Sequence, residues 1–388
     1  MEAQSRSSVW ATGFAMFSMF FGAGNVVFPL AVGQIAQNQT PIAILGLMIS
    51  AIGVPFLGLI SMTLFNGNYH LFFKRIGKVP GYLVSLFILC LIGPFGAMPR
   101  LLTLSHSTFD LAIPGVPLWL FSVIACVVVY LMTFKKNRIL DVLGYVLTPL
   151  LLVTLVIIIV KGIYGAEPAP LSNMTSGTAF LFGLQTGYET MDLLGAFYFS
   201  TVILACLESS EISHGHTKNF RNVIFMTLKS SIIGASLLAL VYFGFCFVAS
   251  FNSASLEGLS RDQFLGAIAI HTLGAYAGIV AIGAVSLACL TTAIALAAVF
   301  SEFLHQDIFR EKISFSNSLV VTLALTFAVS TLGFTGIAAF LAPILVVCYP
   351  ALIVLSILNI GHKMFHFNSV KAPVAVTFII SLLLYVNS

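Results

Sequence analysis

The chain has 388 residues, of which 59% are hydrophobic and 8% charged, with a net charge of +4 and a mean hydropathy of +1.06. A soluble domain carries roughly 25% charged residues, so this composition excludes an ordinary soluble protein and indicates a chain that lies in lipid. The small basic excess comes from short loops, which indicates contact with anionic lipid headgroups and not with nucleic acid.

Apolar stretches recur along the whole chain, and a helix needs about 20 apolar residues to cross the hydrocarbon core. We therefore expect an all-α polytopic membrane protein with about eleven transmembrane helices. The start of the chain lacks the features of a signal peptide, so the first stretch is expected to remain as a span. The stretch 263–302 is too long for one span, and we expect a surface helix before a true span near 275–302. The predicted spans are 9–36, 41–65, 81–101, 117–134, 140–163, 178–206, 223–250, 263–302, 317–333, 336–360 and 372–387.

The basic residues predict the orientation in the membrane. With a cytoplasmic N-terminus, three of the 17 basic residues fall on the outer side, namely Arg100, Lys161 and Arg261. This bias is what the positive-inside rule describes. We expect the N-terminus inside and the C-terminus outside. The inner side then holds Arg6, Lys74, Arg75, Lys78, Lys135, Lys136, Arg138, Lys218, Arg221, Lys229, Arg310, Lys312, Lys363 and Lys371.

The first span contains an interruption. Residues 22–25, Gly-Ala-Gly-Asn, lie near its centre, and Pro29 removes a further backbone donor. Unpaired backbone groups are costly in lipid, so such a break is tolerated only where it lines a buried or wet cavity. An unwound centre offers N–H groups that suit a carboxylate and carbonyls that suit a cation. The alternative is a kinked helix whose small residues allow close helix contact.

The sixth span is interrupted in a similar way, because Gly183, Gly187 and Gly195 surround a polar centre at residues 188–192. Two interrupted spans in corresponding positions of two halves point to a transporter site at the midplane of the membrane. Asp192 lies midway along this span, and an ionisable group at that depth is a functional candidate. The alternative is a carboxylate that faces a hydrated vestibule or caps a half-helix. Glu189 lies one turn further out, where it can face water.

The eighth span contains SLACLTTAIALAAVFSE, which brings the Ala288 carbonyl close to the Thr291 and Thr292 hydroxyls. Oxygen ligands without a cage of carboxylates suit a hard monovalent cation. Threonines in a span more often bond to carbonyls of their own helix, which is the alternative here. No Walker loop, nucleophile elbow or HExxH motif occurs in the sequence, so an enzyme is not expected.

Five stretches, in order along the chain, resemble motifs of the bacterial branched-chain amino acid:cation symporters, the LIVCS family. They are FSMFFGAGNVVFPL (17–30), IGPFGAMPR (92–100), GYETMDLLGA (187–196), ACLTTAIALA (288–297) and LAPILVVCYPALIVL (341–355). That family is similar to the amino acid–polyamine–cation superfamily. The resemblance implies a five-plus-five inverted-repeat transporter fold in which the first and sixth helices are broken. The repeats would be residues 1–165 and 166–362, with residues 363–388 an additional C-terminal span.

The resemblance also implies roles for individual residues. Gly22, Ala23, Gly24 and Asn25 would form the unwound region that binds substrate, with Asn25 also a candidate cation ligand. Tyr188, Thr190 or Asp192 of the sixth span would meet the substrate ammonium or line the pocket. A sodium ion would be held by Ser18, Phe21, Ala288, Thr291 and Thr292. Sodium is the coupling ion in this prediction, and no other cofactor is expected.

Three further features bear on the resemblance. Some proton-coupled relatives place a lysine of the fifth span where sodium would bind, whereas residues 141–160 contain no lysine, which favours sodium. Glu189 stands where an uncharged side chain is more usual, which bears on selectivity. The family usually continues through a twelfth span, whereas this sequence ends after the eleventh, and we expect that difference to affect packing more than transport.

We therefore expect a symporter of the bacterial cytoplasmic (inner) membrane that imports leucine, isoleucine and valine with sodium by alternating access. Its partners would be the amino acid and the lipid bilayer. One alternative is a permease that uses protons or carries another small amino acid. From a different class, the alternative is a channel or a membrane sensor, which would conduct or bind without accumulating substrate.

Overall fold

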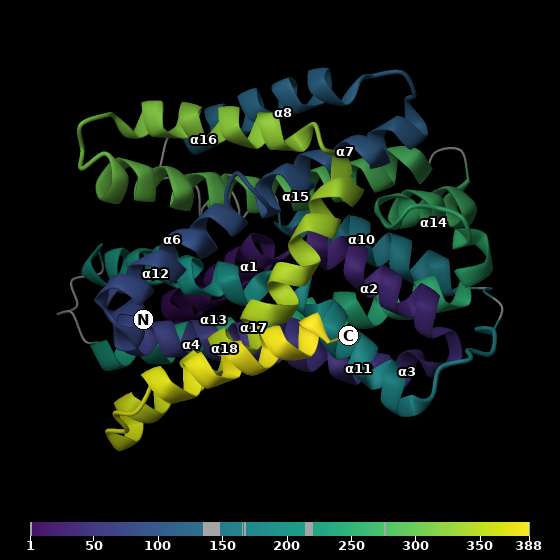
Figure 1. Cartoon of the computed structure of the whole chain (residues 1–388). Coiled ribbons are helices and arrows are strands. Elements are labelled where there is room, and N and C mark those ends of the chain that lie inside the picture. The colour runs from purple at the N-terminus through teal and green to yellow at the C-terminus, as the bar shows by residue number, and fades with distance from the viewer. Residues whose placement is uncertain are drawn as a thin grey trace.

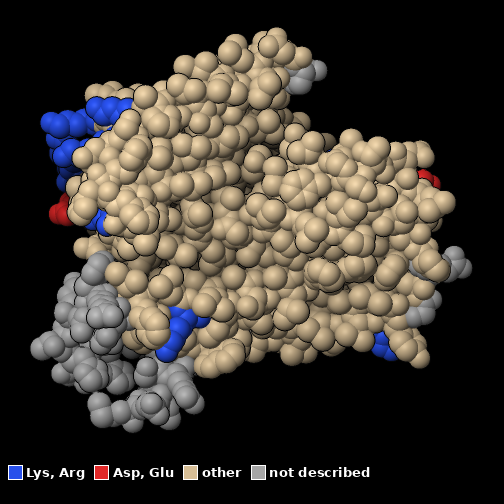
Figure 2. Space-filling view, turned by 90° about the horizontal axis from the view of Figure 1, so that it is seen from below, with Lys and Arg blue, Asp and Glu red and all other residues tan. Residues whose placement is uncertain are grey.

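The computed structural model of the chain describes residues 2–134, 148–164, 166, 168–213, 220–274 and 277–387. These residues form helices and connecting turns, and no strand occurs among them. The helices run side by side in one bundle (Figure 1). On the face seen in Figure 2, most charged residues lie towards the two ends of the bundle, and the middle of this face is free of charge. A bundle with uncharged sides and charged ends fits a lipid bilayer.

The described helices match every predicted span. They are α1 (Glu2–Phe20), α2 (Ala23–Ala36), α3 (Thr40–Met48), α4 (Val54–Leu64), α5 (Tyr69–Phe73), α6 (Lys78–Ile92), α7 (Ala97–Ala112), α8 (Leu118–Thr133), α10 (Thr148–Ile163), α11 (Ser176–Tyr188), α12 (Asp192–Ser213), α13 (Phe220–Phe251), α14 (Phe264–Leu273), α15 (Ala277–Phe303), α16 (Phe315–Ser330), α17 (Gly333–Phe365) and α18 (Lys371–Val386). By length and composition, five stretches of the described chain can cross a membrane, and six further apolar helices are shorter. Residues 140–147 of the predicted fifth span lie outside the described residues, as do Lys135, Lys136, Arg138 and Lys218.

Two of the predicted spans are each divided into two helices, and only one of these divisions was predicted. The stretch 263–302 divides into α14 and α15, as expected. The third span was predicted over 81–101 as one helix, but it divides into α6 and α7 around residues 93–96 and continues to Ala112. The polar residues near its end are accommodated because Ser105 and Thr108 are buried inside the bundle instead of facing lipid.

The packing order places spans from the two halves of the chain against each other. Both halves of the first span, α1 and α2, pack on α13, while α3 and α4 of the second span pack on α11 and α12. The third span, through α7, packs on α15 of the eighth span. If spans 1–5 and 6–10 are related by a two-fold axis, the contact of the first span with the seventh is equivalent to the contact of the sixth span with the second. The contact of the third span with the eighth is then equivalent to itself. The division into repeats at residue 165 stays a prediction.

Glycines allow the backbones of paired helices to approach closely. An added Cβ at Gly183 of α11 would lie 1.9 Å from the Ala43 carbonyl oxygen of α3. A Cβ at Gly33 of α2 would lie 2.0 Å from the Cys246 carbonyl oxygen of α13. Real atoms cannot approach so closely, so these contacts require glycine. Small residues at such crossings are the usual means of tight helix packing in membranes.

We predict that Gly183→Ala lowers the thermal stability of the purified protein, because the new methyl group forces α3 and α11 apart. Overpacking of this kind costs about 1–3 kcal/mol. The matched control is Gly283→Ala in α15, where nothing lies within 4 Å of the added Cβ and the change should be neutral or slightly stabilising. Differential scanning fluorimetry in detergent measures both variants, and equal melting temperatures would contradict the close packing of α3 on α11.

Candidate functional site

The breaks in the first and sixth spans face each other inside the bundle. In the first span, α1 ends at Phe20 and α2 begins at Ala23, and in the sixth span α11 ends at Tyr188 and α12 begins at Asp192. Met191 adopts a left-handed φ of 65°, which turns the chain between the two half-helices. Both interruptions predicted from the sequence are therefore confirmed, and the kinked-helix alternative for the first span is wrong.

The first break is stabilised by its own asparagine. Gly22 is extended, with φ −117° and ψ −158°, and its backbone N–H donates to Asn25 Oδ1 at 3.0 Å. In an unbroken helix this N–H would instead donate to the carbonyl of Ser18, four residues earlier. The cap that Asn25 provides therefore releases the Ser18 carbonyl for other partners.

The released carbonyl meets the two threonines of α15. The hydroxyls of Thr291 and Thr292 donate to Ser18 O at 3.1 and 3.3 Å. Thr291 Oγ1 also donates to Ala288 O of its own helix at 2.9 Å, so the expected bond within the helix and the bond across to α1 occur together. All four residues are buried, and Phe21 is buried in the break beside them.

This arrangement brings neutral oxygens from α1 and α15 into one buried group. An added Cβ at Gly22 would lie 3.0 Å from Thr292 Oγ1, so the unwound backbone lies directly against the threonine. Carbonyl and hydroxyl oxygens without formal charge are the ligands that a hard monovalent cation can use. The hydroxyls can turn their hydrogens away from such an ion, because a hydroxyl rotates to suit its partner.

A second polar cluster joins the two breaks to each other. Asn25 Nδ2 donates to Asp192 Oδ2 at 2.6 Å and also to the hydroxyl oxygen of Tyr242. The Tyr242 hydroxyl in turn donates to Asp192 Oδ2 at 3.1 Å. All three side chains are buried, so a carboxylate in the interior of the bundle is held by two donors. Tyr242 was not predicted as a site residue, since nothing in the sequence distinguishes it from the other aromatic residues of its apolar helix.

Arg100 also belongs to the site, a role that was not predicted from its place at the outer end of the third span. It lies in the first turn of α7 and is 2% exposed. Its guanidinium donates from Nη2 to the carbonyl of Glu189 at 3.0 Å and packs over the rings of Phe28 and Phe334, at 5.2 and 5.9 Å from their centroids. The motif IGPFGAMPR contains this arginine, which the positive-inside count placed on the outer side of the membrane.

These groups surround a small cavity of about 30 Å³. Binding pockets for small molecules measure about 300–1,000 Å³, so the surrounding side chains must move apart to admit an amino acid. The lining residues are Met19, Phe20, Gly22, Ala23, Gly24, Asn25, Ile92, Ala97, Arg100, Leu101, Thr190, Met191, Asp192, Gly195, Phe199, Thr292 and Leu296. The cavity therefore brings together most of the predicted substrate residues.

Tyr188 does not line this cavity. It is the last residue of α11, and its ring packs on Tyr349 of α17 with centroids 4.9 Å apart. Glu189 also points elsewhere, because its carboxylate lies 4.0 Å from the guanidinium of Arg261 in the turn before α14. Its carbonyl, and not its side chain, reaches the site by accepting from Arg100.

Comparisons with known proteins show what the chain is similar to. Residues 5–388 match a family model described as branched-chain amino acid transport protein. The chain is 31% identical over 387 residues to the branched-chain amino acid permease BrnQ of Salmonella typhimurium, covering 97% of this chain and 85% of the permease. It is 30% identical over 404 residues to a putative branched-chain amino acid carrier protein of Staphylococcus aureus, covering 97% and 87% of the two chains.

Solved structures resemble the fold at lower sequence identity. The inward-facing conformation of Mhp1 aligns with a TM-score of 0.61 at 15% identity, covering 97% of this chain and 89% of Mhp1. MhsT, solved in complex with L-phenylalanine, aligns with a TM-score of 0.61 at 12% identity, covering 96% and 97% of the two chains. At these identities the likeness concerns the fold alone, and it agrees with an all-helical polytopic membrane protein.

We predict that Asn25→Ala destabilises the protein by about 1–3 kcal/mol, because it leaves Gly22 N–H without a cap and removes one donor from the buried Asp192. The control is Asn317→Ala at an exposed position of α16, which should change stability by no more than about 0.5 kcal/mol. Thermal unfolding in the same detergent compares the two, and an equal effect would contradict the role of Asn25 in joining the breaks.

Proposed function

The chain belongs to the family of branched-chain amino acid transport proteins, and from this premise we propose that it is a sodium-coupled importer of leucine, isoleucine and valine. It is a secondary transporter and not an enzyme, embedded as a multi-pass protein in a bacterial membrane. The main support for an amino acid substrate is that two side chains of opposite charge, Asp192 and Arg100, line one cavity between the two helix breaks.

This pair of charges is complementary to a zwitterionic amino acid. The substrate ammonium is placed at Asp192, whose carboxylate is otherwise held by neutral donors. The substrate carboxylate is placed at the first amides of α2, at Ala23 and Gly24, where a helix N-terminus favours an anion. Arg100 adds a cation beside these amides, since an added Cβ at Gly24 would lie 3.0 Å from Arg100 Nη2. Thr190 lines the same cavity as the two charges.

The apolar part of the cavity suits a branched side chain. Met19 and Phe20 of α1, Ile92 of α6, Phe199 of α12 and Leu296 of α15 contribute to its wall. An apolar pocket distinguishes substrates by only about 1–3 kcal/mol per methylene. Leucine, isoleucine and valine are therefore expected to share one site.

The proposal of sodium coupling is supported by the oxygen group of Ser18, Ala288, Thr291 and Thr292, and the proposal adds the carbonyl of Phe21 as a further ligand. A sodium ion bound there would link the unwound first span to α15, and so fix the break that also forms the substrate site. Its binding would favour the conformation open to the outside, and its inward gradient would drive the exchange between outward and inward states. In this proposal sodium is carried as a second substrate.

We predict that the protein in proteoliposomes accumulates labelled leucine under an inward sodium gradient, and that valine competes with this uptake. Thr292→Ala should raise the sodium concentration for half-maximal uptake at least tenfold, since it removes one of few ligands. The control is Thr331→Ala, because that hydroxyl is exposed and bonds only within its own helix in the described contacts.

Uptake driven equally well by a proton gradient in potassium would reject sodium coupling while keeping the transporter. A Thr292→Ala protein with wild-type sodium dependence would reject the proposed ion site. If no gradient drives leucine accumulation, the proposed substrate is wrong.

We also predict that Asp192→Asn and Arg100→Gln each raise the KM for leucine by about 10- to 100-fold, because each removes a charged partner of the zwitterion worth about 1.5–3 kcal/mol. Arg100→Lys should not restore transport, since lysine lacks the planar guanidinium. The control is Asp110→Asn at an exposed position, with unchanged uptake. A wild-type KM for leucine in either variant would show that the substituted residue does not bind a charged group of the substrate.

A further inference from the structure

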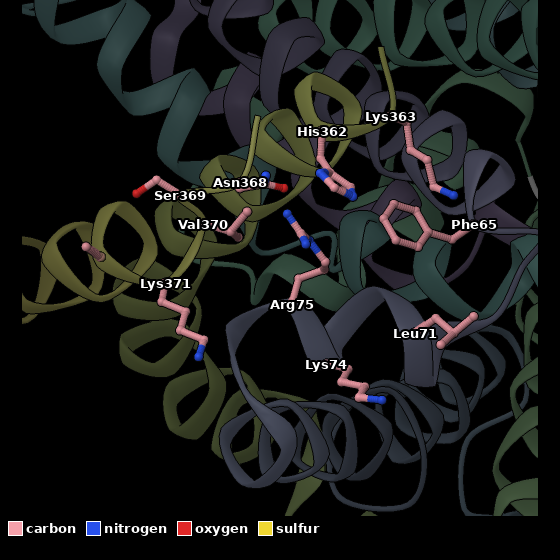
Figure 3. A pocket seen from close by; sticks show the side chains of 11 residues that line it. Phe65, Leu71, Lys74, Arg75, His362, Lys363, Asn368, Ser369, Val370 and Lys371 are labelled. Atoms are coloured by element: carbon pink, nitrogen blue, oxygen red, sulfur yellow. The ribbon is translucent and has the colours of Figure 1, made fainter. Parts of the chain in front are cut away.

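A second and larger pocket lies at one end of the bundle, away from the transport site. It measures about 670 Å³ and is formed by residues around α5, by the end of α17 and by the start of α18. Figure 3 shows it from close by, and Figure 2 shows that Lys and Arg gather most densely at one end of the molecule. Its basic residues lie on the side predicted to face the cytoplasm.

The pocket is lined by cations and by no carboxylate. Lys74, Arg75, Lys363 and Lys371 contribute four formal positive charges, and His362 lies beside them. These residues come from two segments far apart in the sequence, so the fold itself brings the charges together. Like charges repel one another when they face the same space, and an anion that enters it lowers that repulsion.

Arg75 has unused hydrogen-bond donors among the described contacts. Its side chain extends between Val370 and His362 (Figure 3), and its Nη2 donates to the Phe367 carbonyl over a long 3.4 Å. Its Nε is buried and has no partner among the described residues. The guanidinium thus retains unused donors, and a planar fork of donors matches the oxygens of a phosphate group.

Exposed apolar side chains lie beside the pocket. None of the residues of α18 is buried, and Lys371 is the first residue of that helix. Met364 and Phe365 beside the pocket are 62% and 77% exposed, as is expected of residues that contact acyl chains. A ligand here would have its anionic group among the cations and its apolar part along α18.

We propose that this pocket binds the phosphate headgroup of an anionic phospholipid, with the acyl chains lying along α18. Basic pockets between membrane helices on the cytoplasmic side are suited to such headgroups. The exposed apolar flank favours a lipid over a free phosphate ion, since a free ion makes no use of it. This inference is independent of the transported substrate and of the coupling ion.

The test is native mass spectrometry of the full chain in detergent, titrated with phosphatidylglycerol or with phosphatidylcholine. The pocket variant is Arg75→Gln with Lys371→Gln. The matched control is Lys78→Gln with Lys312→Gln, which removes the same charge from exposed positions outside the pocket. We expect the pocket variant to bind phosphatidylglycerol roughly 30-fold more weakly, and the control to change by no more than about threefold.

Equal losses in the two variants, or equal binding of phosphatidylcholine and phosphatidylglycerol by the wild type, would overturn the proposal. Displacement of phosphatidylglycerol by millimolar inorganic phosphate would also overturn it, by assigning the pocket to a free anion. If the double variant does not fold, Arg75→Lys replaces it, because it keeps the charge and loses the fork, and wild-type lipid binding by that variant would count against the proposal.

Discussion

The hydrogen bond from Asn25 to Asp192 is the contact on which the proposed transport site depends. The amide oxygen of Asn25 caps the unwound turn at Gly22, and its nitrogen binds the carboxylate that begins α12. The same cap releases the Ser18 carbonyl toward α15. One buried side chain therefore connects the two helix breaks and, through the backbone, the oxygen group proposed for sodium.

The lipid environment explains why these contacts form one connected network. The polar atoms of an unwound turn or a carboxylate in the interior of the bundle have no water or lipid group to form hydrogen bonds with. Each of these buried polar atoms therefore needs a protein partner. Asp192 has Asn25 and Tyr242, and the Glu189 carbonyl has Arg100. A substrate that displaces any of these partners must replace its bonds, which ties substrate binding to rearrangement of both breaks. The small volume of the cavity agrees with a site that forms fully only as the helices move.

Sequence alone predicted the two breaks, Asp192 and the threonines of α15, because each places polar or helix-breaking residues inside an apolar span. Glycine, asparagine and proline in one turn cannot form an undisturbed helix, and a carboxylate in a span requires a reason. Arg100 and Tyr242 were not predicted as site residues, because neither residue type is unusual at its position in the sequence. An arginine near the end of a span fits a loop equally well, and a tyrosine fits an apolar helix. Tyr188 does not line the cavity because its ring packs on Tyr349 of α17, and the sequence alone does not show this contact between distant helices.

The central claim is that sodium and the amino acid stabilise the same arrangement of the first span. The most direct test measures the leucine Kd of the purified protein over a range of sodium concentrations, and the sodium affinity over a range of leucine concentrations. The account predicts that each ligand tightens the other by one shared factor, about 5- to 150-fold, because coupling between two sites is reciprocal. Leucine binding of equal affinity in sodium and in potassium would contradict it.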